Sequence, residues 1–285
     1  MTEGVLIGAR CALMIDLALL MGLPLFWWAM GMEGRRSGLA MLALGGMAVS
    51  VLWLLASAAA MTGTPISSPD WASAQILLTL TPIGAVLAVR GVALLLALAC
   101  LILPQGLRVA LIPAAVAAAT LAWTGHAGAT EDVTGMFHRV ADVAHIWAAA
   151  GWTGALAVLL HAVAAPRQDV QRMAAMLGGF ALMGTLIVAT LIVSGAINLV
   201  MIVGPAEMPA LTGSRYGLLL GAKLALFGLM LGLAAVNRWR LTPLLERGET
   251  RRALAYLRFS LAIETSAAIA IMGLVAWLGT LDPMA

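Results

Sequence analysis

Apolar residues in this chain are gathered into long runs, and most charged residues lie in the short stretches between them. Eight of these runs are long enough to span a bilayer as a helix, since about 20 residues cross the hydrocarbon core. They cover approximately residues 5–31, 38–61, 82–104, 107–125, 138–163, 173–203, 214–237 and 253–280. The pattern predicts an all-α membrane protein, a bundle of about eight transmembrane helices within a single polytopic domain, residues 1–285.

The start of the third helix is left open by the pattern. Trp71 to Thr81 is also fairly apolar, and Pro82 follows it directly. Proline is favoured in the first turn of a helix but removes a hydrogen bond from a helix interior. The stretch is therefore either an amphipathic cap at the outer surface or the first part of a longer, kinked helix.

Composition agrees with a membrane location, because 62% of the residues are hydrophobic and only 10% are charged, against about 25% charged in soluble proteins. The net charge of +3 does not indicate a nucleic-acid partner, since the arginines lie in alternate short loops. By the positive-inside rule these loops face the cytoplasm, so both termini are predicted to lie outside. The loop arginines are Arg35, Arg36, Arg108, Arg167, Arg172, Arg238, Arg240, Arg247, Arg251 and Arg252.

The first apolar run has no basic segment before it and contains Asp16. A cleaved signal peptide has a basic segment and a shorter apolar core. We therefore expect the first run to be a retained helix.

Two places in the chain suggest an internal repeat. A glycine is followed six residues later by a cation in GAVLAVR, which ends at Arg90, and in GLLLGAK, which ends at Lys223. Repeats of four helices keep the same orientation, so the halves would be parallel and related by an axis normal to the membrane. The possible halves are residues 1–130 and 131–285.

Histidines are concentrated where two apolar runs meet the outer surface. His138, Asp142 and His145 have the spacing i, i+4, i+7 and share one stripe of a helix, with His145 about 10 Å deeper than His138. The preceding run ends just before His126, which returns that side chain to the same face of the membrane, whereas His161 lies at the other face. Such groups are costly against lipid and should face a protein interior or a wet cavity. His126, His138, His145 and Asp142 form the candidate site.

Methionines suggest which metal this site would take. Of the 17 methionines, Met61, Met136, Met201 and Met208 are predicted near the outer face. Thioether and imidazole are soft ligands suited to Cu(I), whereas zinc sites usually contain thiolate, imidazole or carboxylate. The predicted metal ligands are His126, His138, His145, Met61, Met136 and Met208.

Four charged residues, Asp16, Arg90, Lys223 and Glu264, lie within predicted spans. Each alone would be costly in the membrane, and the balance of signs favours pairing across helices. We expect Lys223 to pair with Glu264. Such pairs either fix the register of the helices or belong to an ion or proton path.

Several stretches resemble a known family. They are HIWAAAGWTGAL (145–156), SGAIN (194–198) and YGLLLGAKLALFGLMLGLAAVNRWRLTP (216–243), followed by the helix that contains Glu264. In the first half, PIGAVLAVR and Gly125-His126-Ala127 agree more loosely. Together these stretches resemble the copper resistance protein D (CopD) family of bacterial inner-membrane copper proteins.

The resemblance implies a multi-pass protein of the bacterial inner membrane that handles copper and moves it into the cytoplasm. It carries over His126 and His145 as family histidines, whereas His138 and the methionines come from spacing alone. The family is associated with periplasmic copper-binding partners of the CopC type. Because the sequence contains no such domain, the expected partner is a separate protein.

The combined prediction is a copper homeostasis and resistance protein. Its outward-facing imidazoles and thioethers accept Cu(I), or Cu(II) that is then reduced, as cargo. Asp142 orients or attracts the ion from behind the ligands, and His145, the deepest histidine, hands the ion onward. The sequence contains neither a GxxxxGK[ST] loop nor a CPC motif, so ATP-driven pumping by this chain is excluded and no enzyme activity is expected.

Two alternatives stay open. In the first, His126 and His145 are axial ligands of haem b in an electron-transfer protein, which requires the two histidines at matching depth. In the second, the chain is a copper sensor or assembly factor that does not transport.

Overall fold

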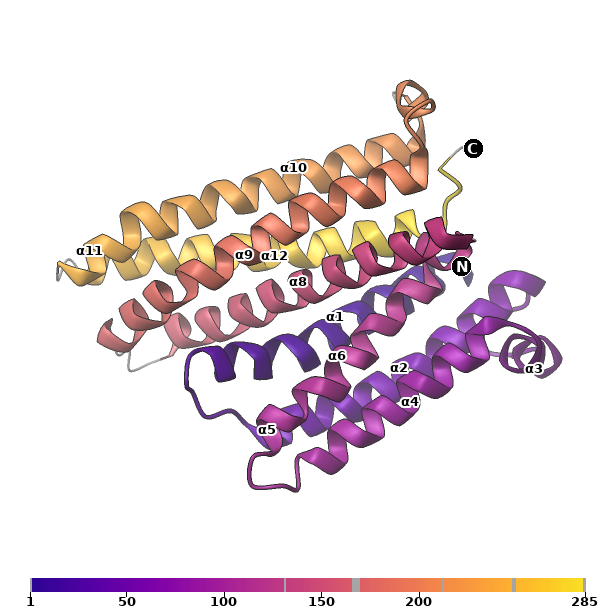
Figure 1. Cartoon of the computed structure of the whole chain (residues 1–285), viewed down its shortest axis with the longest axis horizontal. Coiled ribbons are helices and arrows are strands. Elements are labelled where there is room, and N and C mark those ends of the chain that lie inside the picture. The colour runs from indigo at the N-terminus through magenta and orange to yellow at the C-terminus, as the bar shows by residue number, and fades with distance from the viewer. Residues whose placement is uncertain (1, 131, 166–169, 212, 248–249, 284–285) are drawn as a thin grey trace.

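The structure, a computed structural model, describes residues 2–130, 132–165, 170–211, 213–247 and 250–283, and these are helical over most of their length. Within these ranges, eight helical segments are long and apolar enough to cross a membrane, which confirms the predicted bundle; the fourth is Gly106–Thr124 and the seventh is Arg215–Leu245. They lie side by side along the long axis of the molecule (Figure 1). The main helices are α1 (Thr2–Ala29), α2 (Arg36–Thr62), α4 (Pro82–Cys100), α6 (Leu111–Ala119), α8 (Asp132–Ala164), α9 (Val170–Val203), α10 (Arg215–Val236) and α12 (Thr250–Leu278). Shorter elements are α3 (Trp71–Leu80), α5 (Gly106–Val109), η1 (Thr120–Thr124), α7 (His126–Ala129), η2 (Met208–Leu211), the π-helical turn η3 (Asn237–Leu241) and α11 (Thr242–Glu246).

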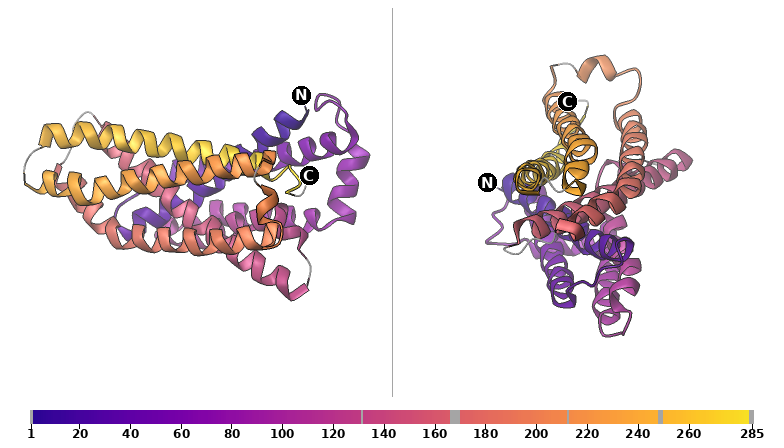
Figure 2. Two further views of the ribbon diagram at one scale, coloured as in Figure 1. Left: turned by 90° about the horizontal axis from the view of Figure 1, so that it is seen from above. Right: turned by 90° about the vertical axis from the view of Figure 1, so that its left-hand side faces the viewer.

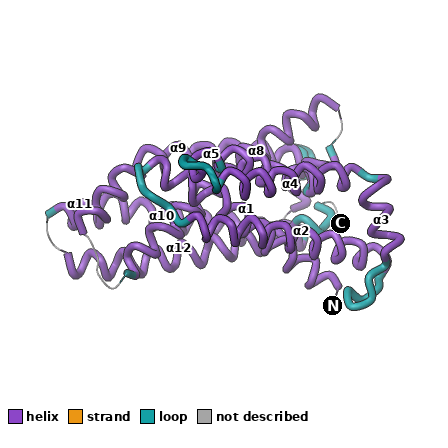
Figure 3. The backbone as a smooth tube through the Cα atoms, turned by 90° about the horizontal axis from the view of Figure 1, so that it is seen from below, coloured by secondary structure: helices purple, strands orange, loops and turns teal. Residues whose placement is uncertain are grey.

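The stretch before Pro82 is a separate helix, α3, and not part of α4. Thr81 has extended backbone, and its Oγ1 accepts a hydrogen bond from the backbone N–H of Ile83, so it ends α3 and caps α4. At the other end of α3, hydrogen bonds from Ser73 hold the pKa of the Asp70 carboxyl below its ordinary value. In Figures 2 and 3, α3 lies across one end of the bundle, which agrees with the cap alternative.

The two ends of the bundle differ in their loops. Both chain termini lie at one end, which we call the termini end (Figure 1). The opposite end, which we call the basic end, contains most of the loop arginines. Those described there are Arg35, Arg36, Arg108, Arg238, Arg240, Arg247 and Arg252, while Arg167 lies outside the described residues. The prediction that the termini end faces the outside still depends on the positive-inside rule.

Helices α1 and α8 form the centre of the bundle and pack closely against each other. Their backbones approach most closely at Gly22 and Gly154, where a Cβ on either glycine would overlap the backbone of the facing helix. Small residues at such a crossing permit backbone contact between helices in a membrane. The two glycines therefore hold together the first and second halves of the chain.

The remaining helices are arranged on either side of this central pair. Helix α1 packs against α2 and α6, and α4 packs against α6; in the second half α8 packs against α9 and α12, and α10 packs against α12. These contacts correspond in the two halves, as a repeat would require, with α1, α2, α4 and α6 in the places of α8, α9, α10 and α12. The repeat itself stays a prediction. One difference is clear: α2 packs against α4, whereas α9 and α10 make little direct contact. Cavities lie between α9 and α10 instead.

The predicted pairing of Lys223 with Glu264 is wrong. Glu264 accepts hydrogen bonds from Asn237 Nδ2 (2.5 Å) and Ser260 Oγ (3.3 Å), and Lys223 lines a different cavity. Helices α10 and α12 are indeed neighbours. However, measured from the termini end of each helix at about 1.5 Å per residue, Lys223 lies roughly 12 Å deep and Glu264 roughly 21 Å deep.

Arg90 is fully buried in the first half of the bundle. Its Nε donates a hydrogen bond to Thr120 Oγ1 (2.7 Å), and its guanidinium lies 5.8 Å from the centre of the Trp53 ring. A hydroxyl and an aromatic face thus stabilise a charge that would be costly in lipid. Asp16 lies against Gly45 and Gly46 of α2.

The crossing of α1 and α8 predicts a strong effect of one methyl group. Gly154→Ala would force the two backbones apart, and overpacking of this kind costs about 1–3 kcal/mol. We expect a lower melting temperature for this variant in detergent, measured by size-exclusion chromatography after heating. Gly178→Ala on α9 is the matched control, because a Cβ there meets nothing within 4 Å. Equal melting temperatures for the two variants would contradict the crossing.

Candidate functional site

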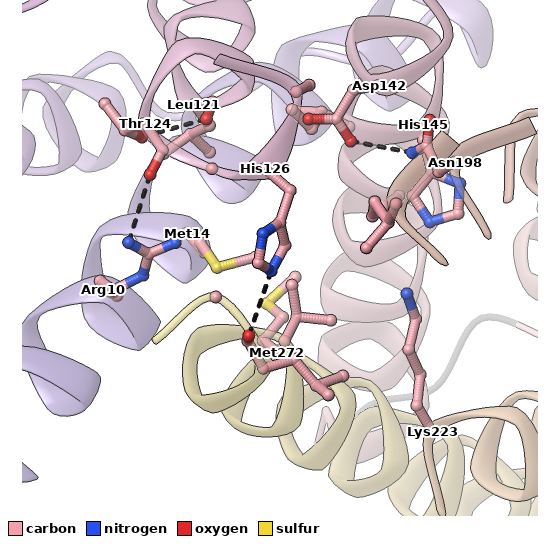
Figure 4. A pocket seen from close by; sticks show the side chains of 18 of the residues that line it. Arg10, Met14, Leu121, Thr124, His126, Asp142, His145, Asn198, Lys223 and Met272 are labelled. Atoms are coloured by element: carbon pink, nitrogen blue, oxygen red, sulfur yellow. Dashed lines mark hydrogen bonds between the residues drawn. The ribbon is translucent and has the colours of Figure 1, made fainter. Parts of the chain in front are cut away.

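A cavity of about 230 Å³ lies at the termini end between α1, α8, α9, α10 and α12. We call it the histidine cavity, because it is lined by the three histidines that were predicted to converge, His126, His138 and His145. Figure 4 shows His126 and His145 in it. Asp142 lines it as well. The structure thus brings these four side chains to one cavity, and their role as a site stays a prediction.

His126 enters the cavity from the short helix α7, which follows the extended residue Gly125. Its Nε2 lies 3.2 Å from the backbone oxygen of Leu278 at the end of α12, and Tyr216 of α10 contacts the ring edge-on, with centroids 6.2 Å apart. The histidine is thus held between α10 and α12. Its Nδ1 takes no part in the bond to Leu278.

His138 and His145 line the cavity from α8. Thr130 Oγ1 lies 2.8 Å from His138 Nδ1, and Ser194 Oγ of α9 lies 2.9 Å from His145 Nδ1. His138 is 1% exposed, and its Nε2 has no hydrogen-bond partner among the described residues. A buried ring nitrogen without a partner is uncommon and indicates a place for water or a ligand.

Asp142 and Lys223 face each other across the same cavity. Asn198 Nδ2 of α9 donates a hydrogen bond to Asp142 Oδ1 (2.9 Å), and the charges of Asp142 and Lys223 attract each other. Asp142 was expected to orient a metal-bound histidine. The hydrogen bonds of the described histidine rings go to hydroxyls and a carbonyl, so Asp142 acts in this structure on Asn198 and Lys223.

The predicted methionines are not part of this cavity. Met61 and Met136 are exposed, and Met208 packs against the apolar cluster around Tyr216. Two other methionines, Met14 of α1 and Met272 of α12, line the cavity on the side of His126 (Figure 4). These two lie well inside their helices, so only the packing of α1 and α12 against α8 reveals them.

The predicted ligands are therefore only partly brought together. Within the described ranges, no three His, Cys, Asp or Glu side chains are placed to hold one metal ion together. What the structure does place in one cavity is a set of imidazoles and thioethers. These are the donors that suit a soft cation such as Cu(I).

Sequence reasoning also missed Arg10, whose Nη1 donates to the backbone oxygen of Thr124 (3.2 Å) at the rim of the cavity. No spacing in the sequence links α1 with this turn, so no signal could have found it. Lys223 was recognised as an intramembrane charge but was assigned to a different partner. Ser194 and Asn198 belong to the SGAIN stretch, and the structure now gives both a contact in the cavity.

Comparisons with known proteins show which family the chain belongs to. A family model described as "Copper resistance protein D-like, N-terminal domain" matches residues 1–136, and one described as "Copper resistance protein D" matches residues 174–278. The protein named "Copper resistance protein D" of Pseudomonas syringae pv. tomato is 37% identical over 305 aligned positions, which cover 99% of this chain and 98% of that protein. The chain belongs to the copper resistance protein D family.

A second relative of this family member is the "Inner membrane protein YebZ" of Escherichia coli (strain K12), which is 28% identical over 57% of this chain and 55% of that protein. No solved structure matches the chain. The two matched ranges of the family models contain His126 and Lys223, whereas His138, Asp142 and His145 lie between them. The full-length relative covers this central segment as well.

The facing charges in the histidine cavity predict a coupling that can be measured. We expect Asp142→Asn and Lys223→Met each to lower the melting temperature in detergent, and the double variant to lose less than their sum, because each single change leaves an unbalanced charge. Lys223→Met combined with Glu264→Gln is the control. The losses of unfolding free energy caused by Lys223→Met and Glu264→Gln should add within about 0.5 kcal/mol, since the two residues share no partner. Additive effects for Asp142 and Lys223 would refute the interaction.

Proposed function

We propose that this family member is a copper resistance protein of the bacterial inner membrane that takes up Cu(I) as cargo at the termini end and moves it toward the basic end. Family membership supports a role in copper handling. The observation that carries the proposal is the presence of three imidazoles and two thioethers in one cavity of a membrane bundle. With the basic end in the cytoplasm, this cavity faces the periplasm.

In the proposed site, His126, Met14 and Met272 receive the cuprous ion, and Nε2 of His138, which has no partner among the described residues, offers a further donor. This retains the three histidines of the predicted ligand set. Met61, Met136 and Met208 are replaced in the proposal by Met14 and Met272, which line the cavity. Neutral soft donors exchange Cu(I) readily while holding hard cations poorly.

His145 is the proposed handover ligand. It lines the histidine cavity and also a second cavity of about 350 Å³ deeper in the bundle, which we call the middle cavity. Lys223, Gly195 and Met272 line both cavities too. An ion held by His145 is therefore already at the entrance of the next space.

The charge on Lys223 opposes the approach of a cation to this boundary. Asp142 reduces that opposition, because its carboxylate faces the same cavity and attracts the ammonium group. We propose that this is the role of Asp142 toward the ion, acting through Lys223. A separate periplasmic protein of the CopC type is the proposed donor of copper at the termini end.

Replacing Met14 and Met272 together by leucine tests the site. Leucine keeps nearly the same volume and removes both sulfur atoms, so we expect Cu(I) affinity to fall by about tenfold or more. Affinity is measured by anaerobic competition with a chromogenic Cu(I) chelator. The control is the double change Met61→Leu and Met136→Leu at the exposed methionines. A loss of Cu(I) affinity in the control variant alone would show that the ion binds at Met61 and Met136 instead.

Elemental analysis of the same purified protein separates copper from haem b. We expect copper in stoichiometric amount and negligible iron after loading with Cu(I). Stoichiometric iron with a Soret band would mean that His126 and His145 hold haem b.

Transport is tested with His145→Ala in sealed vesicles. We expect Cu(I) uptake to slow by about tenfold or more, because the ligand shared by the histidine and middle cavities is gone. His161→Ala on the same helix is the control, since His161 is exposed at the basic end. Absence of uptake by the unaltered protein, with copper binding retained, would favour a sensor or assembly factor.

A further inference from the structure

A third cavity, of about 310 Å³, lies toward the basic end between α8, α9, α10 and η3. We call it the glutamate cavity, because Glu264 of α12 lines it. Trp152 of α8 lines both this cavity and the middle cavity, and it contacts Phe227 of α10 edge-on, with ring centroids 6.0 Å apart. The three cavities thus follow one another along α8 and α10, and aromatic rings stand between the second and the third.

Glu264 is almost completely buried, at 2% exposure. Its Oε1 accepts one hydrogen bond from Asn237 Nδ2 and a longer one from Ser260 Oγ. Asn237 is itself 6% exposed, and its Oδ1 has no hydrogen-bond partner among the described residues. This amide oxygen is a buried acceptor that lacks a donor. A protonated Glu264 has one O–H group, which is the kind of donor that Asn237 Oδ1 lacks.

Among the described residues, no cationic side chain forms a salt bridge or hydrogen bond with Glu264. Arg238 is the only other charged side chain among the described residues that line the glutamate cavity, and its Nη1 is bonded to Ala181 O and Thr185 Oγ1. The titratable side chains described on α10, α8 and α1 do not line the glutamate cavity. Lys223 of α10 and His145 of α8 line the histidine and middle cavities, and Asp16 of α1 faces α2.

We propose that Glu264 and Asn237 form a proton-binding site at the inner end of the copper route, and that binding of this proton releases copper toward the basic end. This inference rests on the proposed function. Carboxylate and amide oxygens are hard ligands and do not hold Cu(I) well. The site therefore takes a proton and acts on the cuprous ion through charge.

The proton balance is simple. Ionised Glu264 carries a negative charge that attracts the cation from the middle cavity past Trp152. A proton from water at the basic end then adds to the second carboxylate oxygen, Oε2, forming an O–H bond that donates to Asn237 Oδ1. The carboxyl group is now neutral and no longer attracts the cation, which leaves. Loss of the proton to water at the same end restores the ionised state.

The test uses the full chain in sealed vesicles, with Cu(I) outside and a pH gradient imposed across the membrane. We expect the gradient to change the rate of Cu(I) uptake several-fold for the unaltered protein and not at all for Glu264→Gln, which keeps the shape of the side chain. Asp16→Asn is the matched control, because it changes a half-buried carboxylate within a spanning helix that lines none of the three cavities. It should respond to the gradient as the unaltered protein does.

A response of Glu264→Gln equal to that of the unaltered protein overturns the inference and leaves the proposed function intact. If the unaltered protein moves no copper, the proposed function fails, and the proton site is judged by infrared difference spectra between acidic and alkaline buffers. A protonated-carboxyl band that is present in the unaltered protein and lost in Glu264→Gln supports the site. Absence of such a band at every pH overturns it.

Discussion

The contact between Gly22 and Gly154 determines where the rest of the molecule can lie. It joins the central helices α1 and α8, against which α2, α6, α9 and α12 pack, and α4 and α10 pack in turn against those outer helices. Toward the termini end, Met14 lies about 12 Å above Gly22 and His145 about 14 Å above Gly154, at about 1.5 Å per residue. Because both helices are fixed at this crossing, a thioether from the first half and an imidazole from the second reach the same height. The cavity that they line therefore depends on the two glycines at the crossing, Gly22 and Gly154, deeper in the bundle.

A second constraint is the cost of polar groups in hydrocarbon, and the two halves meet it differently. In the first half, α2 packs against α4, and Arg90 is enclosed by Thr120 and Trp53. In the second half, α9 and α10 stand apart, and the equivalent cation in the sequence pattern, Lys223, faces two cavities. On the proposed route, the first half contributes Met14 and His126 to the histidine cavity, whereas the middle and glutamate cavities are lined by the second half.

The sequence predicted the features that depend on local periodicity. The eight spans follow from run length, and the shared cavity of His138, Asp142 and His145 follows from helical spacing on α8. Features that depend on which helices touch were missed. Met14 and Met272 could not be assigned without knowing that α1 and α12 both border the cavity, and the pairing of Lys223 with Glu264 failed because neighbouring helices do not place charges at equal depth. The separate helix α3 needed the extended conformation of a single residue, Thr81.

The order of donors along the proposed route matters for the energetics of transport. His138 and His145 are separated by about 10 Å along α8, so an ion moves between them rather than being held by both. Beyond His145 the middle cavity offers the thioethers of Met230 and Met272, and beyond the rings of Trp152 and Phe227 the hard carboxylate of Glu264 follows, so affinity for Cu(I) falls toward the basic end. A monovalent cation that crosses to a negative interior gains about 2.3 kcal/mol per 100 mV, which is roughly a fifty-fold bias. That bias can offset only a modest fall in affinity, so a site that bound copper very tightly at the termini end would stop transport. In the histidine cavity the donors are spread out and do not surround a single point. This arrangement keeps the affinity of the first binding step low enough for the membrane potential to offset its loss.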